Sequence, residues 1–399
     1  MYANLILFQP GSTEAVAIKI KSSSRILKML LVHKIQLKPN KKQEEFFLKS
    51  AGVARFAFNW SLAEWQKQYE AGEKPNEAKL RKQLNSIKAV EFPWMLEVSK
   101  TVPQQAIKNV GIAYKNFFRR VKAGEKPGFP RFKKRGISKD SFRPDNGSSK
   151  DKDALVISNK KVRIPKIGFV KLAEKLRFNG KIIGSIISRI ADQWFISITV
   201  DSDTLPHVRK NHGSCGVDVG INCLAALHDG TKYQPAKALK AFENRLKRQQ
   251  RILSRKKKGS ANRKKSVQKV AKLHYKMRCL RQDVIHKATT DIVLNNDFIA
   301  IEDLNVKGMV KNRKLAQAVN DASMSEFHRQ LEYKSAMYFG HVHKIDRFFP
   351  STKLCMNCGT THDMPLNKRV FKCECGVEED RDIHAAQNIL SQAYIEFAA

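Results

Sequence analysis

The sequence contains no apolar run long enough to cross a membrane. A membrane-spanning helix needs about 18 consecutive apolar residues with few or no charges, and the 399 residues contain no such stretch. The N-terminus also lacks a positively charged leader segment, and its apolar run from Leu5 to Phe8 is too short for a secretory signal. We therefore expect a cytoplasmic chain without a membrane partner, in a compartment where thiols are reduced.

Acidic residues are scarce beside basic ones. The chain has 75 Lys and Arg against 37 Asp and Glu, which gives a formal net charge of +38. Solubility of a small domain needs a net charge of only about 2–8, so the excess indicates a polyanionic partner, and nucleic acid is the obvious one. Apolar residues make up 42% of the sequence, which indicates a folded protein and not a disordered basic tail.

Cysteines are few and unevenly placed. There are seven, an odd number that argues against a disulfide framework. Cys355 and Cys358 form one close pair near the C-terminus, and Cys373 and Cys375 form a second. Two close thiol pairs on separate turns are typical of a tetrahedral, structural Zn²⁺ site. The second pair has the tighter C-x-C spacing, so His362 is an alternative ligand, and redox or incidental thiols are the competing interpretation.

Strand and helix signals are clear near the start of the chain. Residues 1–28 carry little pattern, and we expect a poorly ordered extension there. From Leu30 to Pro39, apolar and polar residues alternate, which predicts a strand. Asn40 followed by Gln43 is a helix-capping pattern, so a helix is expected to begin at this point.

The later patterns indicate two further regions. Helical sequence continues to about residue 122, and short strands then recur up to about residue 206. A β-barrel or sheet interrupted by a helical insertion explains a strand, then helices, then strands again. Beyond Pro206, strands and helices alternate, which predicts an α/β domain.

Two strongly basic segments are candidates for contact with a polyanion. Residues 123–150 form a loop punctuated by glycine and proline, in which Phe129 and Phe132 could stack on bases or sugars. Residues 237–281 have a helical pattern, are rich in Lys and Arg, and contain a single acid, Glu243. A solvated helical hairpin is the alternative interpretation, but a face with so few acids would repel itself unless a polyanion lay against it.

Three acidic positions stand out by their context. Asp218 lies in the apolar stretch GVDVGI, Glu302 and its neighbour Asp303 follow the apolar stretch FIAI, and Asp380 and Asp382 precede a helical pattern. Acids at strand ends and at a helix start can converge at one edge of a sheet. Three such carboxylates would hold two Mg²⁺ ions, or Mn²⁺, on either side of a scissile phosphate. Taken singly, each acid is equally consistent with a turn former or a helix N-cap.

Several segments together resemble one known family. GVDVGIN with LAALHDG, IAIEDLNVKGMVKNRKLA, DRFFPSTKLCMNCG and CECGVEEDRDIHAAQNIL are similar to TnpB, the transposon-encoded nuclease related to type V CRISPR effectors. YKNFFRRVKAGEKPGFPRFKKRG in the first half matches the same family, and the resemblance runs in order from Met29 to Ile389. It implies Asp218, Glu302 and Asp382 as the catalytic, metal-binding acids. It also implies four zinc ligands, which are Cys355, Cys358, Cys373 and Cys375.

The resemblance implies a multidomain α+β fold. An N-terminal, wedge-like β-barrel would be interrupted by a helical bundle and followed by a RuvC or RNase H-like α/β nuclease domain with a zinc-ribbon-like insertion. The expected parts are the extension at 1–28, the barrel at 29–39 and 123–206, the helical recognition insertion at 40–122, the nuclease domain at 207–352 and 378–399, and the zinc-binding element at 353–377.

The activity implied by the resemblance is RNA-guided cleavage of double-stranded DNA. A guide RNA from the transposon end would pair with the target, while the N-terminal part reads a short motif beside it. Phe58 and Asn59 are candidates for that reading. Hydrolysis would depend on Mg²⁺, and one chain would act per guide RNA, in the cytoplasm of a prokaryote and at its nucleoid when on target.

Two other functions fit part of the pattern. An RNA-guided DNA-binding repressor would use the same charge but would be expected to have lost one of the three acids. A transposase-type strand transferase would use the acids but would not explain the zinc element.

Two positions depart from the family pattern. His384 stands where the family usually has Asn after the last catalytic acid, and Met324-Ser325 replaces a common Trp-Gly. Neither departure removes a metal ligand. His384 borders the expected site, so we expect it to affect activity or its pH response.

Overall fold

The computed structural model describes residues 29–144, 155–313, 315–365 and 367–398. The extension at 1–28, expected to be poorly ordered, and the end of the basic loop, at 145–154, lie outside the described residues. Among the helices of the described part, none has the length and apolar character needed to span a membrane. The chain divides into two compact units, Met1–Pro206 and His207–Ala399.

The first unit contains a group of helices, and the first of these helices begins at the capping pattern of Asn40. The Asn40 side chain accepts a hydrogen bond from the backbone N–H of Gln43 (2.9 Å), and the Gln43 side chain accepts one from the backbone N–H of Asn40 (3.1 Å). This reciprocal cap begins the first helix, as the sequence predicts. The helical elements are α1 (Lys41–Glu70), α2 (Glu77–Glu91), the 3₁₀ turn η1 (Pro93–Glu97) and α3 (Thr101–Lys122).

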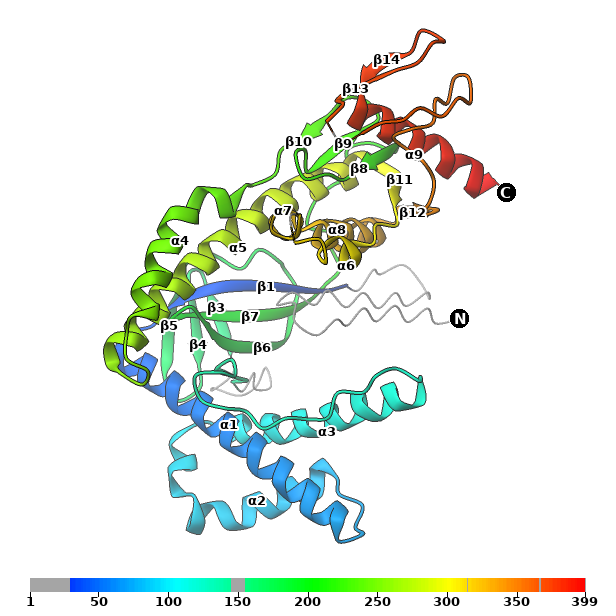
Figure 1. Ribbon diagram of the computed structural model, residues 1–399. Helices are drawn as coiled ribbons and strands as arrows, with labels where there is room; N and C mark the ends of the chain where they lie inside the picture. The colour runs from blue at the N-terminus through cyan, green and yellow to red at the C-terminus, as the bar shows by residue number, and fades with distance from the viewer. Residues whose placement is uncertain (1–28, 145–154, 314, 366, 399) are drawn as a thin grey trace. The chain divides into compact units, whose positions relative to one another are not determined.

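One antiparallel sheet completes the first unit (Figure 1). Its strands pair in the order β2-β6-β7-β1-β5-β4-β3, so the first strand of the chain lies between β7 and β5 and the helices are an insertion. Phe47 of α1 packs on Trp194 of β7 with ring centroids 5.2 Å apart, which joins helices and sheet in one core. The strands are β1 (Met29–Lys38), β2 (Ser141–Phe142), β3 (Val156–Ser158), β4 (Lys161–Ile164), β5 (Gly168–Leu172), β6 (Lys181–Ile190) and β7 (Gln193–Ser202).

The sheet is open, so the prediction of a closed β-barrel was wrong. Strands β2 and β3 form its two edges, and they do not pair with each other in the described residues. Closure of a barrel requires a continuous ladder between the two end strands. With two residues in β2 and three in β3, neither edge offers such a ladder.

The second unit is built on a mixed five-stranded sheet of order β10-β9-β8-β11-β12. Strands β8, β11 and β12 run parallel, whereas β9 and β10 are antiparallel to their neighbours. This alternation of parallel strands with helices is the α/β arrangement expected after residue 206. The strands are β8 (Gly213–Asp218), β9 (Ala225–Leu227), β10 (Lys232–Tyr233), β11 (Asn296–Glu302) and β12 (His341–Ile345), with a separate hairpin of β13 (Val370–Lys372) and β14 (Glu378–Asp380).

Two long helices, α4 and α5, run side by side as a hairpin in the second unit, and the C-terminal helix α9 packs against β8, β11 and β12 (Figure 1). The hairpin buries Leu246, Leu273 and Met277 between its helices. The helices are α4 (Ala238–Ser254), α5 (Ala261–Asn295), α6 (Val306–Met309), α7 (Ala316–Ala322), α8 (Met324–Met337) and α9 (Arg381–Ala398).

Small residues allow α9 to approach the sheet closely. A Cβ atom at Gly216 of β8 would overlap the carbonyl oxygen of Ala386 in α9. Ala385 and Ala386 are fully buried at this contact. The backbones of strand and helix therefore touch, which fixes the start of α9 at the end of β8.

Candidate functional site

Two acidic side chains end neighbouring strands of the second unit. Val217 of β8 pairs with Ile301 of β11 in parallel register, so the next residues, Asp218 and Glu302, stand side by side at the carboxyl ends of the two strands. Cys215, Val217 and Ile301 hold these strands in the core. The carboxyl edge of a parallel sheet is where functional side chains of α/β domains usually gather.

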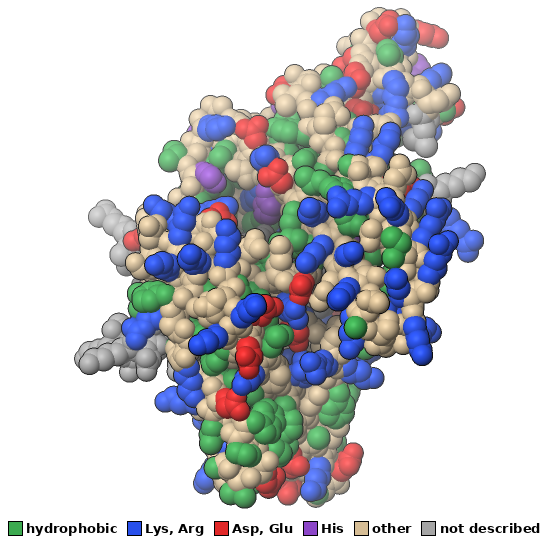
Figure 2. All heavy atoms as spheres, turned by 90° about the vertical axis from the view of Figure 1, so that its left-hand side faces the viewer, with side chains coloured by type: hydrophobic (Ala, Val, Ile, Leu, Met, Phe, Trp, Pro, Cys, Tyr) green, Lys and Arg blue, Asp and Glu red, His purple; other side chains and the backbone are tan. Residues whose placement is uncertain are grey.

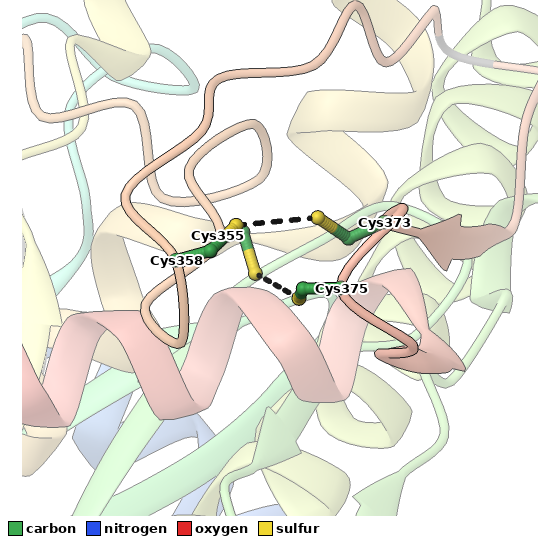
Figure 3. Close-up of side chains that lie close together, drawn as sticks. All are labelled: Cys355, Cys358, Cys373 and Cys375. Carbon is green, nitrogen blue, oxygen red and sulfur yellow. Dashed lines mark hydrogen bonds between the residues drawn. The ribbon is translucent and has the colours of Figure 1, made fainter.

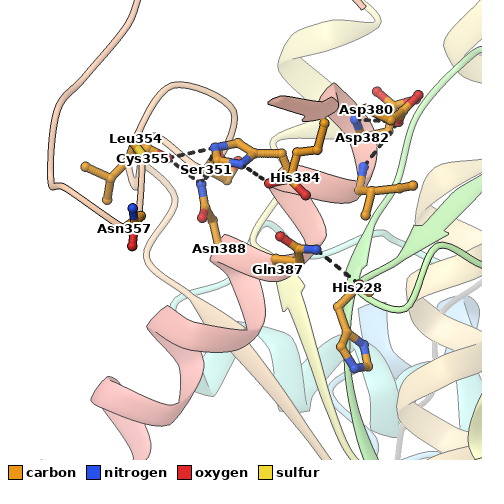
Figure 4. Close-up of polar contacts among 12 residues, drawn as sticks. His228, Ser351, Leu354, Cys355, Asn357, Asp380, Asp382, His384, Gln387 and Asn388 are labelled. Atoms are coloured by element: carbon orange, nitrogen blue, oxygen red, sulfur yellow. Dashed lines mark hydrogen bonds and ion pairs between the residues drawn. The ribbon is translucent and has the colours of Figure 1, made fainter. Parts of the chain in front are cut away.

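The third acid comes from the first turn of α9. The side chain of Asp380 accepts hydrogen bonds from the backbone N–H groups of Asp382 (3.0 Å) and Ile383 (3.3 Å), and its other oxygen lies 2.7 Å from Lys232 Nζ. Asp380 therefore caps the helix, and Figure 4 shows the hydrogen bonds that it accepts at the start of α9, beside Asp382. The two neighbouring acids differ in role, because Asp382 is close enough for its charge to act on Asp218.

The environment of Asp218 and Glu302 disfavours the charged form of both carboxylates. Burial, together with the negative charges of Glu302 and Asp382, raises the pKa of Asp218 to about 8, against opposition from the Arg381 guanidinium and the Val219 backbone N–H. Burial also raises the pKa of Glu302, and a hydrogen bond from Ser351 opposes that rise. A divalent cation would relieve this repulsion, and carboxylate oxygens are the ligands that Mg²⁺ and Mn²⁺ favour.

Asp303, the neighbour of Glu302, is held elsewhere. The Arg347 side chain forms an ion pair with the Asp303 carboxylate, and Arg347 Nε donates to the Asp303 backbone carbonyl (3.0 Å). Its charge is therefore already balanced, which favours Glu302 over Asp303 as a metal ligand. Asp218, Glu302 and Asp382 are all partly exposed.

The four C-terminal cysteines come together in one cluster (Figure 3). Their sulfur atoms all lie within 4.8 Å of one another, with 3.6 Å between Cys355 and Cys375 and 3.4 Å between Cys358 and Cys373. Four sulfurs bound tetrahedrally to Zn²⁺ would be about 3.8 Å apart. The cluster therefore fits a Zn²⁺ ion. His362, the alternative ligand, has its Nε2 3.1 Å from the Cys373 sulfur, at the border of the cluster.

His384 faces residues 353–377, which carry the four clustered cysteines and are called the cysteine element below. Its Nδ1 lies 2.7 Å from Glu379, its Nε2 lies 2.8 Å from the Leu354 carbonyl oxygen, and its ring stacks on Phe371 with centroids 3.6 Å apart. All three partners belong to the cysteine element or its flanks, and the side chain is 3% exposed. The histidine therefore joins α9 to that element.

Basic residues cover the α4–α5 hairpin. Lys256, Lys257 and Lys258 are exposed in the turn between the two helices. Glu243, the single acid of residues 237–281, pairs with Lys247 on the same helix (2.6 Å). Figure 2 shows the same excess over the face in view, where Lys and Arg side chains outnumber acidic ones. Such a surface favours a polyanion.

The candidate residues of the first unit differ in their exposure and in their contacts. Phe129 and Phe132 are 52% and 47% exposed, so their rings are open to a partner. Phe58 is 6% exposed and lies beneath the Lys133 ammonium (4.0 Å to the ring centroid), so it cannot reach a base. Asn59 exchanges two hydrogen bonds with the Lys133 backbone (2.8 and 2.9 Å) and thereby clamps the basic loop to α1.

Sequence reasoning did not identify Ser351, Asn388 or Arg381 as residues of the site. Ser351 lies in a loop between a strand and the first cysteine pair, and Asn388 lies inside a helical pattern. Neither position carries a local signal, because its partners are distant in the sequence. Arg381 stands between two acids in the DRD stretch, which is the one hint the sequence offers.

Family models match most of the chain. One described as "Probable transposase" matches residues 196–313, one described as "Cas12f1-like, TNB domain" matches 325–389, and one described as "Helix-turn-helix domain" matches 29–74. A protein of Escherichia coli (strain K12) named "Putative RNA-guided DNA endonuclease InsQ" is 32% identical over 392 residues, which cover 93% of this chain and 94% of that protein. The chain belongs to the TnpB family. The resemblance inferred from the sequence is thus confirmed.

Another relative agrees with TnpB membership, and one solved structure shares the fold. A Streptomyces pristinaespiralis protein named "Putative RNA-guided DNA endonuclease" is 36% identical over 309 residues, covering 76% of this chain and 74% of that protein. The cryo-EM structure of a Cas12f1–sgRNA–target DNA complex matches with a TM-score of 0.54 at 17% identity, covering 88% of this chain and 83% of that one. At that identity the likeness shows the multidomain α/β fold alone. The segment matched as helix-turn-helix consists of β1 followed by α1 and the residues after it in this TnpB chain.

Proposed function

We propose that this TnpB family member is an RNA-guided DNA endonuclease, which cleaves target double-stranded DNA beside a short motif by metal-dependent phosphodiester hydrolysis. The observation that carries the proposal is the convergence of Asp218, Glu302 and Asp382 from two parallel strands and a helix start. The names of the relatives support the same activity.

The three acids would hold two Mg²⁺ ions, with Mn²⁺ as a substitute. When bound, such ions lower the pKa of the attacking water and stabilise charge on the leaving oxygen. The negative charges of Glu302 and Asp382 both act on Asp218, so a cation bound beside Asp218 would be attracted to all three carboxylates. Asp380 and Lys232 hold the start of α9, and through it they hold Asp382 in place.

A structural Zn²⁺ would occupy the cysteine cluster. All four positions of a tetrahedral ion would be filled by thiolates, so this ion would have no open position for chemistry. Its role would be to hold together an element whose own apolar core is small, with Cys355, Met364 and Phe371 as its buried members. Small elements of this kind usually depend on a metal for their fold.

The basic surfaces would bind the guide RNA and the target DNA. The exposed lysines of the α4–α5 hairpin and the basic loop held by Asn59 are suited to phosphate backbones, which carry no sequence information. Pairing between guide and target would supply the specificity, with one chain for each guide RNA. The bound nucleic acids would also balance the net charge of +38.

The test uses protein co-expressed with the RNA encoded at its own transposon end. Purified complex, Mg²⁺ and a plasmid library with a guide-matched target beside randomised flanks are incubated, and linear product is sequenced. Asp218→Asn is the inactive variant. Asp283→Asn is the matched control, because Asp283 is an exposed acid on α5 that pairs with Lys287 on the same helix.

Linear product that requires the guide, one flank sequence and Asp218 supports the proposal. Guide-dependent binding without cutting by either wild type or Asp218→Asn would overturn it in favour of a repressor. Joining of one DNA to another, in place of hydrolysis, would overturn it in favour of a strand transferase.

A further inference from the structure

We propose that Asn388 and His384 of α9 are positioning residues that couple the cysteine element to Glu302 through Ser351. The inference rests on the proposed function, in which Glu302 is a metal ligand. It concerns buried hydrogen bonds among residues that supply none of the proposed metal ligands. Figure 4 shows those that join Ser351, Leu354, His384 and Asn388.

The series of hydrogen bonds begins at the Glu302 carboxylate. The Ser351 hydroxyl donates to Glu302 Oε1 at 2.5 Å, and Ser351 is 4% exposed. This bond restricts the rotation of the carboxylate, and within the described part of the chain the second oxygen accepts no hydrogen bond. A ligand held in this way presents its oxygen to an ion without a loss of conformational freedom at binding.

Asn388 holds the backbone on which Ser351 stands. Its side-chain amide donates one N–H to the Ser351 carbonyl (2.6 Å) and the other to the Leu354 carbonyl (2.7 Å). Both acceptors are carbonyl oxygens, so both N–H groups are used. With 1% of its surface exposed, Asn388 has no access to solvent that could replace these partners. The segment 351–354 is therefore fixed at both ends by one amide.

The same segment runs directly into the cysteine cluster. Leu354 precedes Cys355, and the Leu354 carbonyl also contacts His384 Nε2 (2.8 Å). On its other side His384 stacks on Phe371 and contacts Glu379, and these two residues flank the second cysteine pair. His384 thus touches both halves of the cysteine element, and a displacement of either half would shift Leu354 and, with it, Ser351.

Helix α9 connects these hydrogen bonds to the proposed metal site. The helix that carries His384 and Asn388 also carries Asp382 in its first turn and contacts Gly216 two residues before Asp218. All three acids therefore depend on one helix, either directly or through Ser351. Loss of a residue that supports a metal ligand typically weakens metal binding by about 10-fold to 100-fold.

The decisive measurement is Mn²⁺ binding to the full-length, zinc-loaded chain, followed by electron paramagnetic resonance of the free ion. Zinc content and the unfolding temperature are measured on every variant. Ser351→Ala and Asn388→Ala should weaken Mn²⁺ binding by about 10-fold or more, with zinc content unchanged. Ser351→Thr keeps the hydroxyl and should bind Mn²⁺ as wild type does. Gln392→Ala is the matched control, because Gln392 lies one turn further along α9 and bonds Glu396 instead.

A double-mutant cycle tests the link to the cysteine element. Cys375→Ser should release zinc and weaken Mn²⁺ binding although it alters none of the three acids. Both changes act through the segment 351–354. The double variant Asn388→Ala/Cys375→Ser should therefore weaken Mn²⁺ binding by a factor much smaller than the product of the two single factors. Full multiplicativity would overturn the coupling.

Two further outcomes separate this inference from the proposed function. If Glu302→Gln weakens Mn²⁺ binding while Asn388→Ala and Ser351→Ala do not, the positioning role is wrong and the proposed metal site stands. If Glu302→Gln itself leaves Mn²⁺ binding unchanged, the proposed metal site is wrong and the inference falls with it.

Discussion

Gly216 of β8 and Ala386 of α9 touch through their backbones. A Cβ atom at Gly216 would overlap the Ala386 carbonyl oxygen and would also crowd Leu390. Because the obstacle is backbone, α9 would have to move as a whole to accommodate a side chain. The contact links the strand that carries Asp218 to the helix that carries Asp382, so the distance between these two acids depends on the absence of one methyl group.

Gly216→Ala should therefore impair the metal site without altering any carboxylate. Overpacking of this kind typically lowers the free energy of unfolding by about 1–3 kcal/mol. Cleavage and Mn²⁺ affinity should fall together. Urea unfolding and Mn²⁺ titration measure both effects. Gly52→Ala is the control, since a Cβ there would meet only Arg55 at 4.0 Å. That change should leave the site intact and stabilise α1 by about 0.5–1 kcal/mol. Wild-type cleavage by Gly216→Ala would contradict the role given to this contact.

Asp380 and Asp382 should respond differently to substitution. Asp380 caps α9 and pairs with Lys232, so Asp380→Ala should lower the free energy of unfolding by about 1 kcal/mol and reduce cleavage only partly. Asp382→Asn keeps the shape of the side chain but removes a proposed metal ligand, so cleavage should fall by more than the roughly 10–100-fold that a supporting residue costs. Cleavage rates and unfolding curves of the two variants decide the matter. The reverse pattern would assign the metal to Asp380.

The raised pKa of Asp218 predicts that the protein free of Mg²⁺ and Mn²⁺ loses stability as pH rises. The folded chain keeps this carboxyl protonated up to a pKa of about 8, whereas an ordinary Asp releases its proton near 3.8. Between these values Asp218 binds its proton more tightly in the folded state than in the unfolded state, so its contribution to the free energy of unfolding falls from about pH 4 to about pH 8. Asp218→Asn should remove the part of this dependence that comes from Asp218, while the raised pKa of Glu302 leaves a part of the same sign. The unfolding temperature of the variant should exceed that of wild type most clearly at pH 8.

The same proton must leave when an ion binds. Mn²⁺ affinity of the wild type should therefore rise by about tenfold per pH unit below pH 8 and then level off. Asp283→Asn serves as the control for both measurements, since it replaces an exposed acid on α5. If Asp218→Asn showed the pH dependence of the wild type, another group would be responsible for it.

The α4–α5 turn should contribute to RNA binding through charge alone. Replacing Lys256, Lys257 and Lys258 by Ser should weaken guide-RNA binding and reduce the slope of log affinity against log salt by about 2, because each phosphate contact to a single strand contributes about 0.7. Filter binding at several salt concentrations measures the slope. Lys287→Ser is the control, because Lys287 pairs with Asp283. An unchanged slope in the triple variant would mean that these lysines do not contact phosphates.

Local patterns determined much of the fold. Three features involve only residues that are close along the chain: the cap at Asn40 and Gln43, the alternation in β1 and the close thiol pairs. Such features can therefore be recognised from the sequence alone. The acids that follow apolar strands are local features of the same kind, and the family resemblance distinguished Asp382 from Asp380 where the pattern alone did not. The excess of basic residues is likewise a property of composition and needs no fold.

Only the tertiary structure decided how distant segments meet. The open sheet in place of a barrel depends on which strands pair and how long the edge strands are, and no local signal specifies either. Ser351 reaches Glu302 across 49 residues and Asn388 reaches Ser351 across 37, so their hydrogen bonds exist only because α9 packs on the sheet. The sequence makes Phe58 a candidate for reading the motif beside the target, but Phe58 is buried beneath Lys133 in the folded unit. Contacts of this kind are products of packing summed over the whole unit, whereas caps and periodic patterns are set by neighbours along the chain.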